Sequence, residues 1–317
     1  MENEKYPIEK YEILLGWLCN QHCIYCSIGH KLRQPQIKTF EEAKKSIEKA
    51  KSLSVKKISF SGGEPTIIPH LIEAVKYANN LGFEKIEIQT NGRMFSNETF
   101  AKKVLNAGVN SFVITINADS AKLHNFLAMT NNAFEESISG LQNIIKLKKG
   151  KDITLGTNTV ITTYNYKILP RIINFLLGFD IQIYYITPII IDGFAYYNKN
   201  ILVPKLSVIA PFVHKSIDLL RKNNKELVTS SLPYCLMKGY ENTISDMRLV
   251  NTILDGPDCK IFVLQNRQRF RIKTDRCKLC KYFNICLGVW IRYVKMFGFG
   301  EFIPVPGKPI QDMNEVY

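Results

Sequence analysis

Hydrophobic and polar positions in the first two-thirds of the chain follow two alternating periods. Short apolar runs, typical of strands, are separated by segments whose apolar residues recur every three to four positions, as in amphipathic helices. In the segment 39–53, Thr39 is the expected N-cap of such a helix. Its apolar face consists of Phe40, Ala43, Ile47, Ala50 and Leu53. The pattern therefore predicts β–α units that follow one another along the chain.

About six units of this kind are expected. The predicted strands lie within residues 12–17, 56–65, 84–92, 110–117, 152–162 and 180–188. The predicted helices lie within residues 39–53, 70–82, 97–108, 133–150, 166–178 and 206–224. This alternation favours an α/β fold with a parallel sheet and helices outside it. Six units fit an open doubly wound sheet or an incomplete barrel, and in both the functional site lies where the strands end.

The pattern changes near residue 225, so we expect two domains, 1–224 and 225–317. The second domain contains five of the eight cysteines and few regular helices. Within it, the runs 260–264 and 269–273 flank the segment QNRQ, which predicts a β-hairpin. Five cysteines in a segment with little apolar periodicity indicate a small subdomain held together by metal.

Targeting signals are not evident in the sequence. The first residues, MENEKYPIEK, are polar, and no run approaches the roughly 18 apolar residues of a membrane span. We therefore expect a cytoplasmic protein that does not associate with membranes. Cytosolic thiols stay reduced, so eight cysteines favour metal binding or catalysis over disulfides.

The chain carries a formal net charge of +14, which favours an anionic partner such as RNA or an acidic peptide. Half of this charge lies between Lys260 and Lys281, where eight basic residues accompany one acid, Asp275. In the predicted hairpin, four basic residues at alternate positions would share one strand face: Arg267, Arg269, Arg271 and Lys273. That face would either meet an anion or simply be solvated.

A cysteine-rich loop, CNQHCIYC, follows the first predicted strand. Cys19, Cys23 and Cys26 have the spacing C-x3-C-x2-C. A structural zinc site takes four ligands, usually from two C-x2-C pairs. Three thiolates in one loop leave a fourth position open, and thiolates are the standard ligands of a [4Fe–4S] cluster. The histidines expected to be loop or surface residues rather than ligands are His22, His30 and His124.

In order and placement, these motifs resemble those of radical S-adenosylmethionine (radical SAM) enzymes. Tyr25 precedes the last cysteine of the loop, GGEPT (62–66) follows the second strand, and QTNG (89–92) ends the third. The resemblance covers roughly residues 10–224. It implies a partial (β/α)6 TIM-like barrel in which a [4Fe–4S] cluster cleaves S-adenosylmethionine reductively. It also implies a 5′-deoxyadenosyl radical that abstracts hydrogen from a substrate.

The resemblance further implies the residues that bind these cofactors. Cys19, Cys23 and Cys26 would be the catalytic cluster ligands, and Tyr25 would border the adenine. The glycine-rich motif expected at the methionyl amine consists of Gly62, Gly63, Glu64 and Pro65. The polar strand-end residues expected near the ribose and carboxylate are Thr90, Asn91, Asn117, Asn158 and Thr187.

A second cysteine set follows the pattern C-x2-C-x5-C and consists of Cys277, Cys280 and Cys286. Alone, this spacing fits a zinc ribbon or packed thiols. Behind a radical SAM domain it resembles the SPASM and twitch extensions, which carry auxiliary [4Fe–4S] clusters. Trp290 stands where the full SPASM pattern has another cysteine, so one cluster in a twitch-like extension is implied. Its fourth ligand would be Cys235, with Cys259 as the alternative.

Three substrate classes follow from these patterns. Many family members with such extensions modify ribosomally made peptides, so a peptide or protein is the first candidate. The basic segment makes RNA or a nucleotide the second, and a small molecule that is dehydrogenated or rearranged is the third. The intact motifs argue against a degenerate barrel that only binds. The expected partners are an acidic peptide or RNA as substrate and an electron donor such as flavodoxin or ferredoxin.

Overall fold

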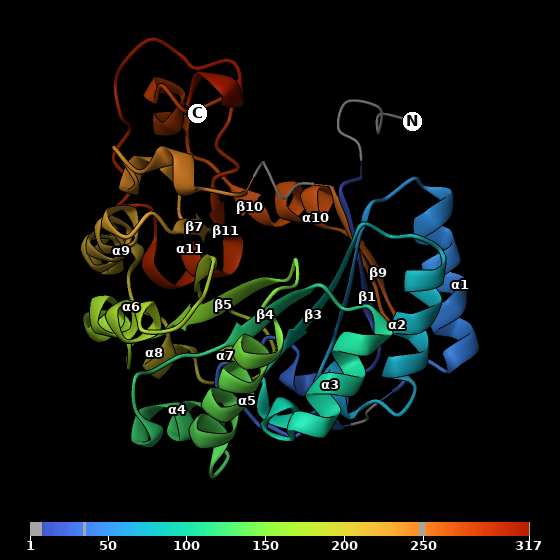
Figure 1. Ribbon diagram of the computed structural model, residues 1–317. Helices are drawn as coiled ribbons and strands as arrows, with labels where there is room; N and C mark the ends of the chain where they lie inside the picture. The colour runs from blue at the N-terminus through green and yellow to red at the C-terminus, as the bar shows by residue number, and fades with distance from the viewer. Residues whose placement is uncertain (1–7, 34–35, 247–250, 317) are drawn as a thin grey trace.

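A single curved sheet organises the chain (Figure 1). The computed structural model describes residues 8–33, 36–246 and 251–316, so the polar residues 1–7 lie outside it. The sheet has nine strands in the order β7-β6-β5-β4-β3-β2-β1-β8-β9. Within the described residues, no helix is long and apolar enough to cross a membrane.

The six expected strands are confirmed and run parallel to one another. They are β1 (Lys10–Leu14), β2 (Lys57–Ser61), β3 (Lys85–Thr90), β4 (Ser111–Thr115), β5 (Thr154–Ile161) and β6 (Ile183–Pro188). Three later strands extend the same sheet, namely β7 (Glu226–Thr229), β8 (Thr252–Asp255) and β9 (Lys260–Phe262). β7 is parallel to β6 and β8 is parallel to β1, whereas β9 is antiparallel to β8. The fold is therefore the expected partial barrel, with additional strands at both edges.

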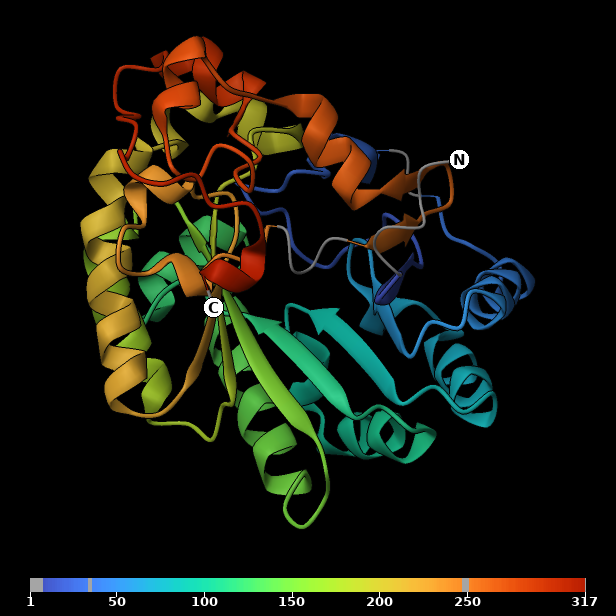
Figure 2. The same ribbon diagram turned by 90° about the horizontal axis from the view of Figure 1, so that it is seen from above.

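Helices cover the convex face of the sheet (Figure 2). The expected helices are α1 (Phe40–Ser52), α2 (Leu71–Asn80), α3 (Glu98–Ala107), α5 (Ala133–Leu147), α6 (Leu169–Leu177) and α9 (Leu206–Lys222). Thr39 caps α1 as predicted, because its side chain accepts from Glu42 N–H while the Glu42 carboxylate returns to Thr39 N–H. Three short helices were not predicted from the sequence: α4 (Ala121–Ala128), α7 (Gly193–Tyr197) and α8 (Lys199–Leu202).

The two faces of the sheet differ in polarity. The side chains that face the helices are apolar and fully buried, as at Ile13, Phe60 and Ile88. The alternate positions carry a hydrogen-bonded ionic network centred on Glu87. Its carboxylate accepts from Lys10 Nζ at 2.7 Å and lies 2.9 Å from Lys57 Nζ. The concave face of the barrel is therefore polar but close to charge-balanced, with the carboxylate of β3 matched by lysines of β1 and β2.

The C-terminal segment lies across the open, concave side of the barrel (Figure 2). It contains β7, β8 and β9, the helices α10 (Val263–Phe270) and α11 (Ile291–Phe297), and a two-stranded sheet of β10 (Arg271–Ile272) and β11 (Val289–Trp290). The hairpin predicted over 260–273 is wrong, because residues 263–270 form a helix. β9 pairs instead with β8, and β10 with β11. The two segments expected to pair with each other, β9 and β10, therefore pair with other strands of the chain.

Replacing Glu87 with Ala should lower the free energy of unfolding by about 1.5–3 kcal/mol, because Lys57 would lose this carboxylate and the buried Lys10 would keep only Glu12 as its counter-charge. The midpoint of anaerobic urea unfolding of the cluster-loaded protein measures this effect. Glu84→Ala is the matched control, since Glu84 forms an exposed pair with Lys56 and should cost less than about 1 kcal/mol. Equal losses in the two variants would contradict the structural role given to Glu87.

Candidate functional site

The first cysteine set lies in the loop between β1 and α1, at the carboxyl ends of the strands. Backbone hydrogen bonds fix this loop to neighbouring segments. His22 and Ile24 donate to the carbonyls of Ala128 and Leu127 at the end of α4, and Phe194 of α7 donates to Cys26 O at 2.8 Å. The two unpredicted helices α4 and α7 thus hold the loop from both sides.

The three thiols of this loop are half-buried soft donors from one short segment. All eight cysteines of the chain are free of disulfides. Burial is the largest cause that raises the pKa of Cys19 and of Cys23 to about 12; the Glu64 carboxylate contributes for Cys19, and the neighbouring cysteine sulfurs contribute for both. Burial also raises the pKa of Cys26. As thiolates these groups need a nearby cation, and bound iron supplies one, so the donor set fits a [4Fe–4S] cluster.

The GGEPT motif packs directly against the start of the cysteine loop. Gly63 N–H donates to Gly16 O and Glu64 N–H donates to Leu18 O, both at 2.8 Å. A Cβ on Gly63 would lie 2.2 Å from Leu18 O, and one on Gly62 would lie 2.4 Å from Gly16 O. Only glycine permits this approach, so the motif joins the end of β2 to the segment that leads into Cys19.

Glu64 is buried and its carboxylate is occupied by protein donors. Oε1 accepts from the hydroxyl of Thr90 at 2.7 Å and from Thr66 N–H at 3.0 Å, and Oε2 accepts from Asn91 N–H at 2.8 Å. These bonds join the end of β2 to the end of β3, where Thr90 and Asn91 lie. Three of the predicted cofactor residues are therefore coupled to one another at adjacent strand ends.

The remaining predicted cofactor residues form two pairs further along the sheet. Asn117 Nδ2 donates to the Tyr25 hydroxyl at 2.6 Å, while its Oδ1 accepts from Val160 N–H at 2.8 Å. The Thr187 hydroxyl donates to Asn158 Oδ1 at 3.1 Å. All of these side chains lie toward the carboxyl ends of β4, β5 and β6. Their roles toward S-adenosylmethionine stay predictions.

Two residues that support this edge, Arg93 and His124, were not predicted from the sequence to do so. Arg93 donates to Asn20 O within the cysteine loop and pairs with Glu136, and its charge opposes the rise in the Cys19 pKa. Its position directly after QTNG was the available signal. His124, expected at the surface, is instead buried in α4 and accepts from Asn117 N–H through Nδ1 at 3.3 Å. Burial lowers the pKa of His124 to about 4, so the ring is neutral.

The second cysteine set surrounds one cavity in the C-terminal segment. The cysteines that line it are Cys235, Cys277, Cys280 and Cys286. Burial, followed by the three other sulfurs, raises the pKa of Cys235 to about 12. Backbone N–H groups of Gly288 and Val305 lie 3.3 and 3.4 Å from the sulfurs of Cys286 and Cys280. Four thiols with such donors around an apolar cavity fit a second [4Fe–4S] cluster.

Cys259 lies apart from this cavity. It follows β8, and its sulfur lies near Gly256, whose added Cβ would be 2.9 Å from it and 3.1 Å from the Trp17 ring. Lys31 and Asp258 are its charged neighbours. The structure therefore groups Cys235, and not Cys259, with the C-x2-C-x5-C cysteines.

Neither cysteine set is arranged around a single ion. In the part of the chain that the structure describes, no three His, Cys, Asp or Glu side chains converge closely enough to hold one metal ion. The thiolates of a four-iron cluster each bind a different iron and are separated by the cluster itself.

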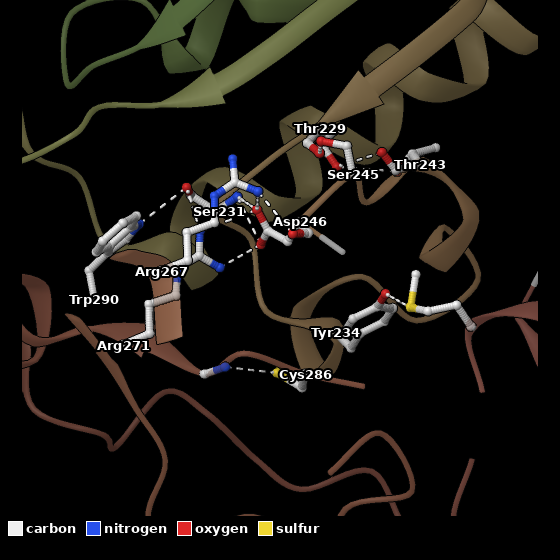
Figure 3. A network of polar contacts seen from close by, with 12 residues as sticks. Thr229, Ser231, Tyr234, Thr243, Ser245, Asp246, Arg267, Arg271, Cys286 and Trp290 are labelled. Atoms are coloured by element: carbon white, nitrogen blue, oxygen red, sulfur yellow. Dashed lines mark hydrogen bonds and ion pairs between the residues drawn. The ribbon is translucent and has the colours of Figure 1, made fainter. Parts of the chain in front are cut away.

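A buried ionic network lies beside the second set (Figure 3). Arg271 Nη1 donates to Asp246 Oδ2 at 2.6 Å, its guanidinium lies over the Trp290 ring, and Arg267 is 3.5 Å from the same carboxylate. Burial opposes ionisation of Asp246, but the two guanidinium groups outweigh it and lower the Asp246 pKa. The expected basic strand face is therefore wrong, since Arg267 and Arg271 point into the protein.

Comparison with known proteins assigns the family. A model described as the radical SAM superfamily matches residues 15–176, about half of the chain, including CNQHCIYC and GGEPT. The chain belongs to the radical SAM superfamily. It is accordingly a radical SAM enzyme, and the cofactors of this superfamily are a [4Fe–4S] cluster and S-adenosylmethionine.

Curated relatives of this radical SAM chain are similar over part of their length. A "Probable GTP 3',8-cyclase" of Methanothermobacter marburgensis is 29% identical over 145 residues, which cover 45% of this chain and 46% of the relative. An "AdoMet-dependent heme synthase" of Methanosarcina barkeri is 26% identical over 162 residues, covering 51% and 44%. The chain thus spans about half the length of the curated relatives it matches.

Solved radical SAM structures share the fold over nearly the whole chain. Streptococcus suis SuiB bound to S-adenosylmethionine aligns with a TM-score of 0.66 over 95% of this chain and 76% of its own, at 15% identity. The enzyme anSMEcpe with bound AdoMet and a peptide aligns with a TM-score of 0.60 over 89% of both chains, at 16% identity. The shared fold therefore includes the C-terminal segment as well as the barrel.

Cys235→Ser should remove the iron of the second cluster, because it deletes one of four thiols around the cavity. Iron content after anaerobic reconstitution should fall from about eight to about four per chain, as expected for two four-iron clusters. Cys259→Ser is the matched control and should keep all of the iron. The reverse pattern would make Cys259 the fourth ligand.

Gly63→Ala should displace the segment that leads into Cys19, because the new methyl group would overlap Leu18 O. We expect loss of the first cluster, seen as about four irons per chain that no longer respond spectroscopically to S-adenosylmethionine. Gly300→Ala is a suitable control, since nothing lies within 4 Å of a Cβ at that position. Normal cluster assembly in Gly63→Ala would refute the close-packing argument.

Proposed function

We propose that this enzyme cleaves S-adenosylmethionine at a cluster held by Cys19, Cys23 and Cys26 and abstracts hydrogen from a peptide or protein. When bound, the cluster and cofactor supply one-electron cleavage of the sulfonium and the oxidising 5′-deoxyadenosyl group. The observation that carries the proposal is the pair of cysteine sets, three thiols at the barrel edge and four around a separate cavity. Three thiols leave one iron free for the cofactor, whereas four leave none.

The residues at the strand ends would bind and orient the cofactor. Gly62, Gly63, Glu64 and Pro65 would form the motif at the methionyl amine, and the two glycines pack this motif against the segment that leads into Cys19. Tyr25 would border the adenine. The polar residues proposed for the ribose and carboxylate are Thr90, Asn91, Asn117, Asn158 and Thr187. Because Glu64 already accepts several protein hydrogen bonds, we assign it mainly to shaping the site.

A cluster at the auxiliary site would transfer electrons or stabilise the fold of this segment, and it would not bind the substrate directly. Cys235, Cys277, Cys280 and Cys286 would saturate a four-iron cluster, leaving no iron for a substrate atom. Such a cluster could accept the electron of a substrate radical. It would also stabilise a segment that has few regular elements.

A peptide or protein is the substrate class that the comparisons favour. SuiB, whose likeness covers 94% of this chain, has been solved with its precursor peptide SuiA. A nucleotide is the second candidate, because curated relatives with 26–29% identity include probable GTP 3',8-cyclases. The engagement of Arg267 and Arg271 with Asp246 removes two charges from the surface proposed for RNA. An acidic substrate and a flavodoxin or ferredoxin donor complete the proposal.

The Cys19/Cys23/Cys26→Ala variant tests the proposed chemistry. With dithionite and S-adenosylmethionine, the wild type should form 5′-deoxyadenosine and the variant none, while the variant keeps about four of about eight irons. Zinc in place of the remaining iron would contradict the proposed auxiliary cluster. A wild type without iron would refute the proposed radical SAM chemistry.

Substrate class is tested by adding candidate substrates to the wild type. An acidic peptide panel should accelerate 5′-deoxyadenosine formation, and the modified peptide should show a mass change. Acceleration by GTP or by RNA, with binding that falls steeply with salt, would favour the nucleotide alternative instead.

A further inference from the structure

Gln21 has an unusual environment inside the first cysteine loop. This residue lies between Cys19 and Cys23 in the sequence, and it is 4% exposed. Cys23 Sγ donates to Gln21 Oε1 at 3.2 Å. Among the described residues, Gln21 Nε2 is one of four buried side-chain atoms without a hydrogen-bond partner. A buried amide group with an unused donor is costly unless another state of the protein uses it.

Binding of iron would reverse the hydrogen-bonding character of Cys23. A thiol can donate to an amide oxygen, but a metal-bound thiolate has no proton and can only accept. The oxygen of Gln21 would then face a negatively charged sulfur. Rotation of the amide by half a turn exchanges Oε1 and Nε2 and needs no movement of the backbone. Nε2 would then donate to the sulfur, and Oε1 would take the position that Nε2 holds now.

We propose that Gln21 is a positioning residue that donates an N–H···S hydrogen bond to Cys23 in the cluster-bound enzyme and raises the reduction potential of that cluster. This inference rests on the proposed function of the loop. Hydrogen bonds to cluster sulfurs stabilise the more negative, reduced state and are a main determinant of potential. The Tyr25 hydroxyl, held by Asn117, also contacts Cys23, so two side chains would serve the same sulfur.

Gln21→Leu tests the proposal, because leucine fills a similar volume without a donor. The first cluster is identified in the holoenzyme as the one whose electron paramagnetic resonance signal changes on adding S-adenosylmethionine. In redox titrations we expect its equilibrium constant for reduction to fall about tenfold, a shift of about 59 mV to lower potential. Gln268→Leu, at an exposed position of α10, should leave the potential unchanged.

A measurement on the wild type decides the matter if the variant assembles poorly. Enzyme labelled with ¹⁵N at the glutamine side-chain amide should show a ¹⁵N coupling to the reduced first cluster in pulsed electron paramagnetic resonance. Absence of this coupling, or an unchanged potential in a fully loaded Gln21→Leu variant, would overturn the inference. Either result could occur while 5′-deoxyadenosine formation is normal. Absence of iron or of S-adenosylmethionine cleavage in the wild type would instead refute the proposed function.

Discussion

Two backbone hydrogen bonds, from Gly63 to Gly16 and from Glu64 to Leu18, join the ends of β1 and β2, and the rest of the site depends on them. The two backbone segments can approach this closely only because Gly62 and Gly63 face the carbonyls of Gly16 and Leu18. These bonds set where the chain turns into Cys19. The Glu64 carboxylate then accepts hydrogen bonds from Thr90 and Asn91, so the end of β3 is fixed to the same segment. The carboxyl edge of the sheet is thus one hydrogen-bonded unit.

The barrel could be predicted from the sequence because its elements are specified locally. The capping box of Thr39 and the apolar face of α1 lie within one short segment. The apolar run that forms β2, before GGEPT, is also contained in one short segment. The cysteine motif and its place after β1 needed only the order of elements. The structure places Cys235 beside the last three cysteines although Cys259 is nearer to them in sequence, and the assignment of Cys235 as the fourth ligand stays a prediction.

The C-terminal segment could not be predicted in the same way because its contacts are long-range. Alternating basic and apolar residues between 260 and 273 satisfied the rule for a hairpin. The decisive partner, Asp246, lies outside that stretch and pairs with Arg271 and Arg267 (Figure 3). Residues 263–270 form a helix. The sequence pattern identified the two arginines as charged but did not indicate that their side chains are buried. His124 was misjudged for the same reason, since its role depends on Asn117 of a neighbouring element.

The pairing of β1 with β8 has a consequence for biosynthesis. Residues 10–13 on β1 lie beside residues 252–255, so the strand that leads into the cysteine loop keeps an unpaired edge until the segment that forms β8 has left the ribosome. Such distant pairing slows folding, and an unpaired edge invites association with other strands. During synthesis this edge of β1 should therefore be exposed to such association until β8 pairs with it.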